Sequence, residues 1–200
     1  MNRRIFTSVL SVLLLTGASA FAQTSTQPSA QTSSWSIDTN HAQTDFRIRH
    51  MGVSTVRGSI GGVTGTIVWD ENDLTKSSVN ATIDATTVTT NNGMRDKDLK
   101  SANFFNVEKY PTITFKSTSV NRVNGKLQVT GDLTLAGVTK PVTLDVDGPT
   151  APQKGMGGKT VIGLSATGKI KRSDFNFAPK YPGAMLGNEV QITIDVEADQ

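Results

Sequence analysis

The chain has 200 residues with 20 Lys or Arg against 17 Asp or Glu, a formal net charge of +3, and no cysteine. This charge is small and interspersed, whereas nucleic-acid binding requires a clustered basic stripe, so we expect no nucleic-acid partner. Without disulfides, stability must come from an apolar core and a hydrogen-bonded sheet.

Residues 1–22 have the layout of a secretory signal peptide. Arg3 and Arg4 precede an apolar run from Val9 to Leu15, and small residues follow up to Ala22. The run is much shorter than the roughly 20 apolar residues that span a bilayer. We therefore expect export, cleavage after Ala22 or two residues earlier, and no transmembrane segment in the mature protein, whose 18 basic and 17 acidic residues nearly balance.

Residues 23–34 (QTSTQPSAQTSS) are polar and contain no large apolar side chain. Such a segment cannot bury enough apolar surface to fold, so we expect a disordered leader. No internal repeat follows, and the glycine-rich stretch from Gly148 to Lys159 reads as a loop within one domain. The predicted domain therefore covers residues 35–200.

From Trp35 onward, apolar residues mostly recur at every second position, which places alternate side chains on opposite faces of a strand. Turn residues such as Asn124-Gly125 and Gly137 separate these runs, and the run from Lys159 to Lys171 mixes in glycine, as a bending strand does. Many short strands predict an all-β sandwich or barrel. The alternating sets are Phe46, Ile48 and His50; Val63, Ile67 and Trp69; Val79, Ala81 and Ile83; Ile113 and Phe115; Leu127, Val129, Leu133 and Leu135; Val142, Leu144 and Val146; and Val190, Ile192, Ile194 and Val196.

The stretch from Asn91 to Pro111 breaks the two-residue period and predicts one or two short helices, with Asn92 or Ser101 as capping residue. Phe104 and Phe105 near its end have two interpretations. They either close one end of a packed core or line the mouth of a hollow barrel, because closed sheets of about eight strands can do both.

Catalytic and metal-binding residues are sparse. The two histidines, His41 and His50, are not at the short spacing of zinc ligands, and no serine lies in a Gly-x-Ser-x-Gly elbow. The acidic run from Asp70 to Asp73 lacks the glycine and terminal glutamate of a calcium loop. We assign no catalytic residue, no metal and no cofactor, and expect that the protein is not an enzyme.

Six blocks of the domain resemble the YceI family of periplasmic polyisoprenoid-binding proteins, in the family's order and spacing. The most specific block is GDLTLAGVTKPVTL, from Gly131 to Leu144. The other blocks are Phe46–Gly52 (FRIRHMG), Arg95–Phe104 (RDKDLKSANF), Tyr110–Phe115 (YPTITF), Lys169–Phe175 (KIKRSDF) and Asn188–Val190 (NEV).

The resemblance implies an extended antiparallel lipocalin-like β-barrel of about eight strands with a short helical insertion. Its apolar interior would hold a polyisoprenoid or similar long-chain amphiphile, and such proteins are typically periplasmic, often dimeric and commonly linked to stress. The chain departs from many relatives, which have histidine at Asp98 and phenylalanines at Ile60, Val63 and Ile67. These departures put a headgroup contact at Asp98 in question and favour a wider or differently shaped cavity.

A polyisoprenoid offers essentially no hydrogen bonds, so its affinity must come from apolar area withdrawn from water. Three polar residues, His50, Arg95 and Arg172, are predicted to meet a headgroup at the mouth, with ordinary surface charge as the alternative. The alternation of side chains along a strand cannot distinguish a cavity wall from a packed core, so each apolar candidate could equally be a packing residue. The predicted lipid-binding residues are Phe46, Ile48, Val63, Ile67, Ile83, Phe104, Phe105, Phe115, Leu133 and Leu135.

Alternative functions remain open at the level of sequence. The ligand could be a fatty acid, a fatty amide or a quinone, or the barrel could be a solid-core structural or interaction domain. A lipid-modifying enzyme would need a buried His50 held by a carboxylate beside a nucleophile. An internal void would distinguish a binding protein from a solid-core domain.

Overall fold

The computed structural model describes residues 32–200, so the predicted signal peptide and nearly all of the predicted leader lie outside the described residues. The first strand begins at Ser33, two residues before the predicted start of the domain. Ser33 pairs with Trp69 and Ser34 with Val68, so the neighbouring strand brings these two serines into the sheet. The end of the predicted leader is therefore strand.

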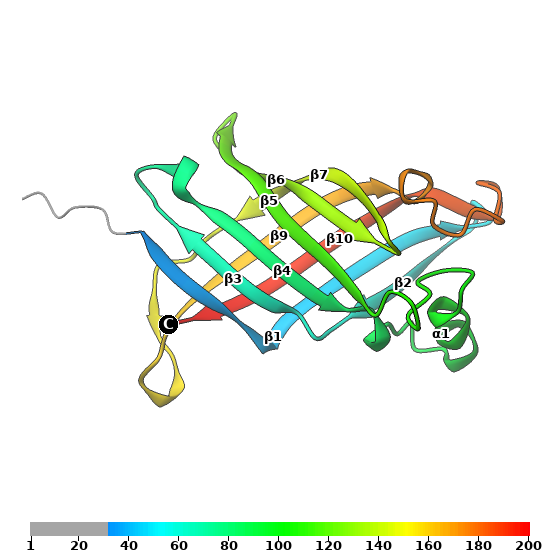
Figure 1. The fold of residues 1–200 in the computed structure, drawn as a ribbon, viewed down its shortest axis with the longest axis horizontal. Coiled ribbons are helices and arrows are strands. Elements are labelled where there is room, and N and C mark those ends of the chain that lie inside the picture. Colours follow the sequence, from blue (N-terminus) through cyan, green and yellow to red (C-terminus); the bar gives the residue numbers. More distant parts are fainter. Residues whose placement is uncertain (1–31) are drawn as a thin grey trace, which may run out of the picture.

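Residues 32–200 form one antiparallel sheet with a single α-helix (Figure 1). The helix, α1, covers Gly93–Lys100, and short 3₁₀ turns lie at Leu74–Lys76, Ala85–Thr87, Met156–Gly158 and Arg172–Phe175. The strands are β1 (Ser33–His50), β2 (Ser54–Ile60), β3 (Thr64–Trp69), β4 (Ser78–Asp84), β5 (Thr112–Val123), β6 (Lys126–Leu135), β7 (Val138–Asp147), β8 (Gln153–Lys154), β9 (Thr160–Lys171) and β10 (Leu186–Asp199).

The sheet closes on itself because β10 pairs with β1 on one side and with β9 on the other. The closed order is β10-β1-β3-β4-β5-β6-β7-β9, which makes an eight-stranded barrel. The first part of β1 pairs with β3 and the second part with β2, so β2 extends the position of β3 along β1. This arrangement confirms the predicted antiparallel barrel with a short helical insertion.

Tight turns fix the pairing of β5, β6 and β7. Asn124 and Gly125 both have positive φ (51° and 80°), as do Ala136 and Gly137 (47° and 79°). Two successive positive φ values are those of a type I′ turn, whose twist matches that of the flanking strands. At Gly137 a Cβ atom would also lie 2.6 Å from the ring of Tyr110, so only glycine fits there without displacing the ring.

The predicted helical insertion forms one helix, and residues 102–110 are turns rather than a second helix. Asn92 caps α1 as predicted, because its side chain accepts a hydrogen bond from the backbone N–H of Arg95 (3.1 Å). Ser101 instead follows the last helical residue and donates its N–H to the carbonyl of Asp98. The turns then carry Phe105 into the barrel end, where it is 8% exposed.

Candidate binding cavity

The barrel interior contains two neighbouring cavities with mostly apolar walls. The larger one, about 320 Å³, includes Phe46, Phe105 and the exposed His50 in its wall, and we call it the mouth cavity because it reaches the surface there. The smaller one, about 120 Å³, includes Val63 and Val129, and we call it the rear cavity. The two share a set of wall residues that we call the waist: Ile83, Leu133, Ile192 and Ile194.

All ten apolar residues predicted from the sequence lie in these walls. Three of them, Val63, Ile67 and Phe115, line the rear cavity alone, while Ile83 and Leu133 belong to the waist. Alternation along the strands therefore located eight of these residues on the inner surface, Phe104 and Phe105 came from the helical insertion, and contact with a ligand stays a prediction. The other five line the mouth cavity: Phe46, Ile48, Phe104, Phe105 and Leu135.

Four aromatic rings from two distant segments meet at the mouth. Phe104 lies 6.0 Å from Phe177 and 5.1 Å from Tyr181, and Phe105 lies 4.9 Å from Phe177, measured between ring centroids. Such edge-on and tilted pairs add attraction beyond the area they bury. These contacts join the turns after α1 to the loop of residues 176–185, and we call the four rings the aromatic clasp.

Phe177 and Tyr181 were not among the predicted site residues. They lie in a loop (NFAPKYPGAM) without any periodic pattern, so alternation could not select them. The only signal in the sequence is two aromatic residues in a loop rich in proline and glycine. Similarly, many inward residues of β2, β9 and β10 were not selected, and nor was the polar Thr44 of β1, although all line the mouth cavity.

Arg172 lies in the wall of the mouth cavity but is not free to meet a headgroup. It is 6% exposed, and burial lowers the pKa of its guanidinium. All five of its N–H donors are used, at 2.5–3.1 Å, so neither a headgroup contact nor ordinary surface charge describes it. The five acceptors are the backbone carbonyls of Phe177, Ala178, Tyr181, Leu186 and Gly187.

Arg172 instead holds the loop that carries half of the clasp. Its acceptors bracket residues 177–187, so one side chain connects the loop to the start of β10. The sequence shows Arg172 as a basic residue in a block that resembles the family. It does not show that the loop folds around the guanidinium of this residue. Arg172 therefore has no free N–H group with which to bind a headgroup, and the headgroup role predicted for it is not supported.

Arg95 and His50 remain as polar groups at the mouth. Arg95 donates from Nε to the hydroxyl of Thr90 (2.7 Å) and from Nη2 to the carbonyl of Thr90 (3.1 Å). Asp96 also contacts this threonine, and the hydroxyl of Thr90 is the main cause of the lowered pKa of Asp96. Within residues 32–200 the Nη1 group of Arg95 makes no hydrogen bond, which leaves it available at the rim together with the exposed His50.

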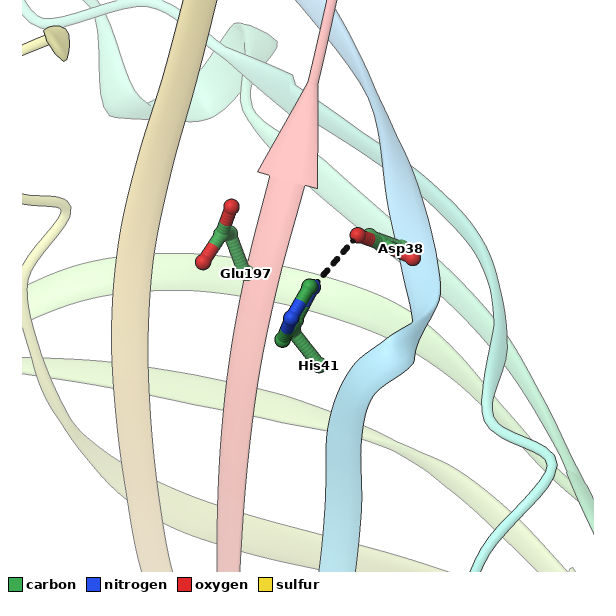
Figure 2. A group of neighbouring side chains, drawn as sticks. All are labelled: Asp38, His41 and Glu197. Atoms are coloured by element: carbon green, nitrogen blue, oxygen red, sulfur yellow. Dashed lines mark hydrogen bonds and ion pairs between the residues drawn. The ribbon is translucent and has the colours of Figure 1, made fainter. Parts of the chain in front are cut away.

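A second group of titratable residues lies on the wall of the rear half (Figure 2). β1 bulges between Ile37 and Ala42, and the bulge brings Asp38 and His41 opposite Glu197 of β10. Nδ1 of His41 lies 2.7 Å from Asp38, which lowers the pKa of Asp38 and raises that of His41. The His41 side chain is 65% exposed, so we interpret the group as a surface ion pair beside a carboxylate.

The closed sheet and its apolar interior define this chain as a hollow lipocalin-like β-barrel. A family model described as the YceI-like domain matches residues 35–198. The curated Protein YceI of Escherichia coli O157:H7 is 45% identical over 160 residues, which cover 80% of this chain and 82% of that protein. The chain therefore belongs to the YceI-like domain family.

Solved structures agree with this assignment. The crystal structure of the Campylobacter jejuni YCEI protein is 35% identical and has a TM-score of 0.67, covering 76% of this chain and 89% of that one. A polyisoprenoid binding domain from Saccharophagus degradans has a TM-score of 0.59 over 82% of this chain and 97% of its own, and at 14% identity it shows the fold alone. Within residues 32–200, α1 is neither long nor apolar enough to cross a membrane.

Proposed function

We propose that this protein binds a long-chain lipid inside the barrel and sequesters or carries it. The observation that carries the proposal is the pair of neighbouring apolar cavities that share the waist residues, the larger of which reaches the surface at the mouth. A preformed concave site lined by apolar side chains with a few polar groups at one end is typical of sites for small amphiphiles. The solid-core alternative predicts an interior filled by side chains, so the two cavities argue against it.

The energetics favour a ligand long enough to enter both cavities. Each buried CH₂ group contributes about 0.8 kcal/mol, so roughly ten carbons contribute about 8 kcal/mol before the cost of association. A short chain held only in the mouth cavity would therefore bind weakly. A chain that passes the waist buries additional carbons against Val63, Ile67 and Phe115.

A polyisoprenoid is our first candidate for the ligand. It is supported by the family and by the polyisoprenoid binding domain that shares the fold. A fatty acid, a fatty amide or a quinone would satisfy the same apolar walls. A polar end at the mouth would meet Arg95 and His50, whereas Arg172 is better described as holding the loop.

A binding role is better supported than catalysis. A lipid-modifying enzyme would need a buried His50 held by a carboxylate, but His50 is exposed and makes no side-chain hydrogen bond within residues 32–200. The proposal includes export to the periplasm, supported by the signal layout of residues 1–22, and a role in stress, supported by the family resemblance. A homodimer is a further proposal that light scattering can test.

The proposal is tested by identifying what the protein carries when purified from a bacterium that exports it. Organic extraction and mass spectrometry should find a long-chain lipid in near-stoichiometric amount. A parallel preparation of Phe105→Asp, which places a charge in the mouth, should carry much less. Finding no lipid in either preparation, and no uptake of added lipid by the wild type, would reject the binding function.

A further inference from the structure

One polar side chain faces the apolar interior without a partner. Thr44 belongs to the inward column of β1, is 7% exposed and lines the mouth cavity. In the described part of the chain, its hydroxyl is the only buried side-chain nitrogen or oxygen without a hydrogen bond. Buried polar atoms in folded proteins nearly always have partners, so such an exception calls for an explanation.

The strand register places Thr44 beside the waist. It pairs with Ile194 of β10 on one side and with Ile60 of β2 on the other. Ile194 lines both cavities, so the hydroxyl lies at the depth of the wall residues that the mouth and rear cavities share. Its neighbours across the sheet are therefore apolar.

The fold itself does not require this hydroxyl. A valine has nearly the same shape and would fill the position without burying an unsatisfied O–H, which destabilises the protein. A water molecule is a poor partner, since a buried water needs two to four polar contacts and both strand neighbours of Thr44 are apolar. None of the other polar side chains of the two walls bonds to Thr44 within residues 32–200: His50, Arg95, Asp98, Arg172 and Tyr181 in the mouth cavity, and Ser77 and Ser78 in the rear cavity.

We propose that the Thr44 hydroxyl donates a hydrogen bond to an acceptor oxygen of the bound lipid, held at the waist between two apolar segments. The inference rests on the proposed function and narrows its ligand class. At this depth the lipid then carries a carbonyl, ester or ether oxygen, which an unmodified polyisoprenoid chain lacks, so the inference favours an oxygen-bearing long-chain lipid over our first candidate. Thr44 is then a residue that determines specificity, because it favours oxygen-bearing chains over hydrocarbon chains of equal length.

The test uses delipidated full-length mature protein and two probes that differ in one group, 9-heptadecanone and heptadecane. The ratio of ketone affinity to heptadecane affinity should be about tenfold higher in the wild type than in Thr44→Val, which is the effect of one ordinary hydrogen bond. Thr44→Val should still bind heptadecane, and Thr44→Ser should keep the affinity ratio of the wild type. The lipid-free Thr44→Val protein should also melt at a higher temperature than the wild type, because the unsatisfied hydroxyl is gone.

An affinity ratio of ketone to heptadecane that is the same in the wild type and in Thr44→Val would overturn the inference while leaving lipid binding intact. A native extract that contains only pure hydrocarbon would also overturn it. If neither probe binds to the wild type, the proposed function fails, and the inference fails with it. Ile60→Val is the matched control, because it removes one methylene beside Thr44 without changing any polar group.

Discussion

The mouth and rear halves of the barrel interior are built in different ways. The wall of the rear cavity comes mainly from regular strands, whose alternation places Val63, Ile67 and Val129 inward. The mouth is completed by two irregular segments, residues 102–110 and 176–185, which contact each other through the aromatic clasp. The rear is therefore fixed by the sheet, whereas the mouth depends on a few side chains that can be removed individually.

This difference indicates where a ligand enters. Opening the rear half would break the strand ladder, which is paired continuously from β3 through β7. Widening the mouth requires that Phe104 and Phe105 separate from Phe177 and Tyr181, without breaking a strand pairing. We expect that changes at the mouth alter ligand retention and exchange, and that changes at the rear alter which chain length fits.

The largest expected effect comes from Arg172. Replacing it with methionine removes five hydrogen bonds to backbone carbonyls, of which that of Ala178 keeps another donor, the N–H of Tyr181, and we expect a loss of about 3–5 kcal/mol of unfolding free energy. Urea unfolding of the exported protein measures this change. Arg172→Lys keeps the charge but offers fewer donors, so its unfolding free energy should lie between those of the wild type and Arg172→Met. A loss below about 1 kcal/mol in Arg172→Met would show that the loop is held by its other contacts.

The second effect tests the aromatic clasp. Phe105→Asp places a charge among buried rings, and we expect retained lipid to fall at least tenfold, which corresponds to about 1.4 kcal/mol. Mass spectrometry of extracts from equal amounts of folded protein measures the ratio. Phe105→Leu keeps an apolar side chain and should retain most of the lipid. Lys97→Ala, on the exposed face of α1, should change nothing, and an effect equal to that of Phe105→Asp would remove the case for a clasp.

The third change acts on the rear half. Val129→Phe on β6 adds bulk inside the cavity of about 120 Å³, so the end of a long chain no longer fits. If three methylenes are excluded, long-chain binding weakens by about 2 kcal/mol while a shorter lipid is unaffected. A series of lipids of increasing length, measured by calorimetry, tests this expectation. If Val129→Phe weakened the binding of all lipids equally, a long chain would not be filling first the mouth cavity and then the rear cavity.

The division between the two halves also separates what the sequence could predict from what it could not. Side chains such as Phe115 and Leu133 were identified because a strand repeats every two residues, which is a local property. The roles of Phe177 and Arg172 depend on how an irregular loop folds back onto β10, and nothing in the periodicity encodes that. Thr44 shares the alternation of Phe46 and Ile48, which places it inward, but it was missed because only apolar side chains were selected for the inner face.

The bulge in β1 illustrates the same limit outside the barrel. Asp38 and His41 are three residues apart, which is an unremarkable spacing on a strand. Only the register shift between Ile37 and Ala42 turns both toward Glu197, which belongs to the other end of the chain. Because Ile37 lines the rear cavity, this ion pair lies on the outer side of the rear wall.

The smallest expected effect concerns the protonation of this pair. Asp38 raises the pKa of His41 in the folded protein, so the pair stabilises the fold fully below the ordinary histidine pKa of 6.5, and this stabilisation is lost as pH rises through the raised value. The lowered pKa of Asp38 means that the contribution is also lost in acid, as pH falls through that value. NMR titration of His41 should give a midpoint above 6.5 that falls in Asp38→Asn. Lipid binding should not change across this titration, because the pair lies on the outer side of the rear wall. A change in lipid affinity that follows the His41 midpoint and disappears in His41→Gln would show that protonation of the pair alters the rear cavity.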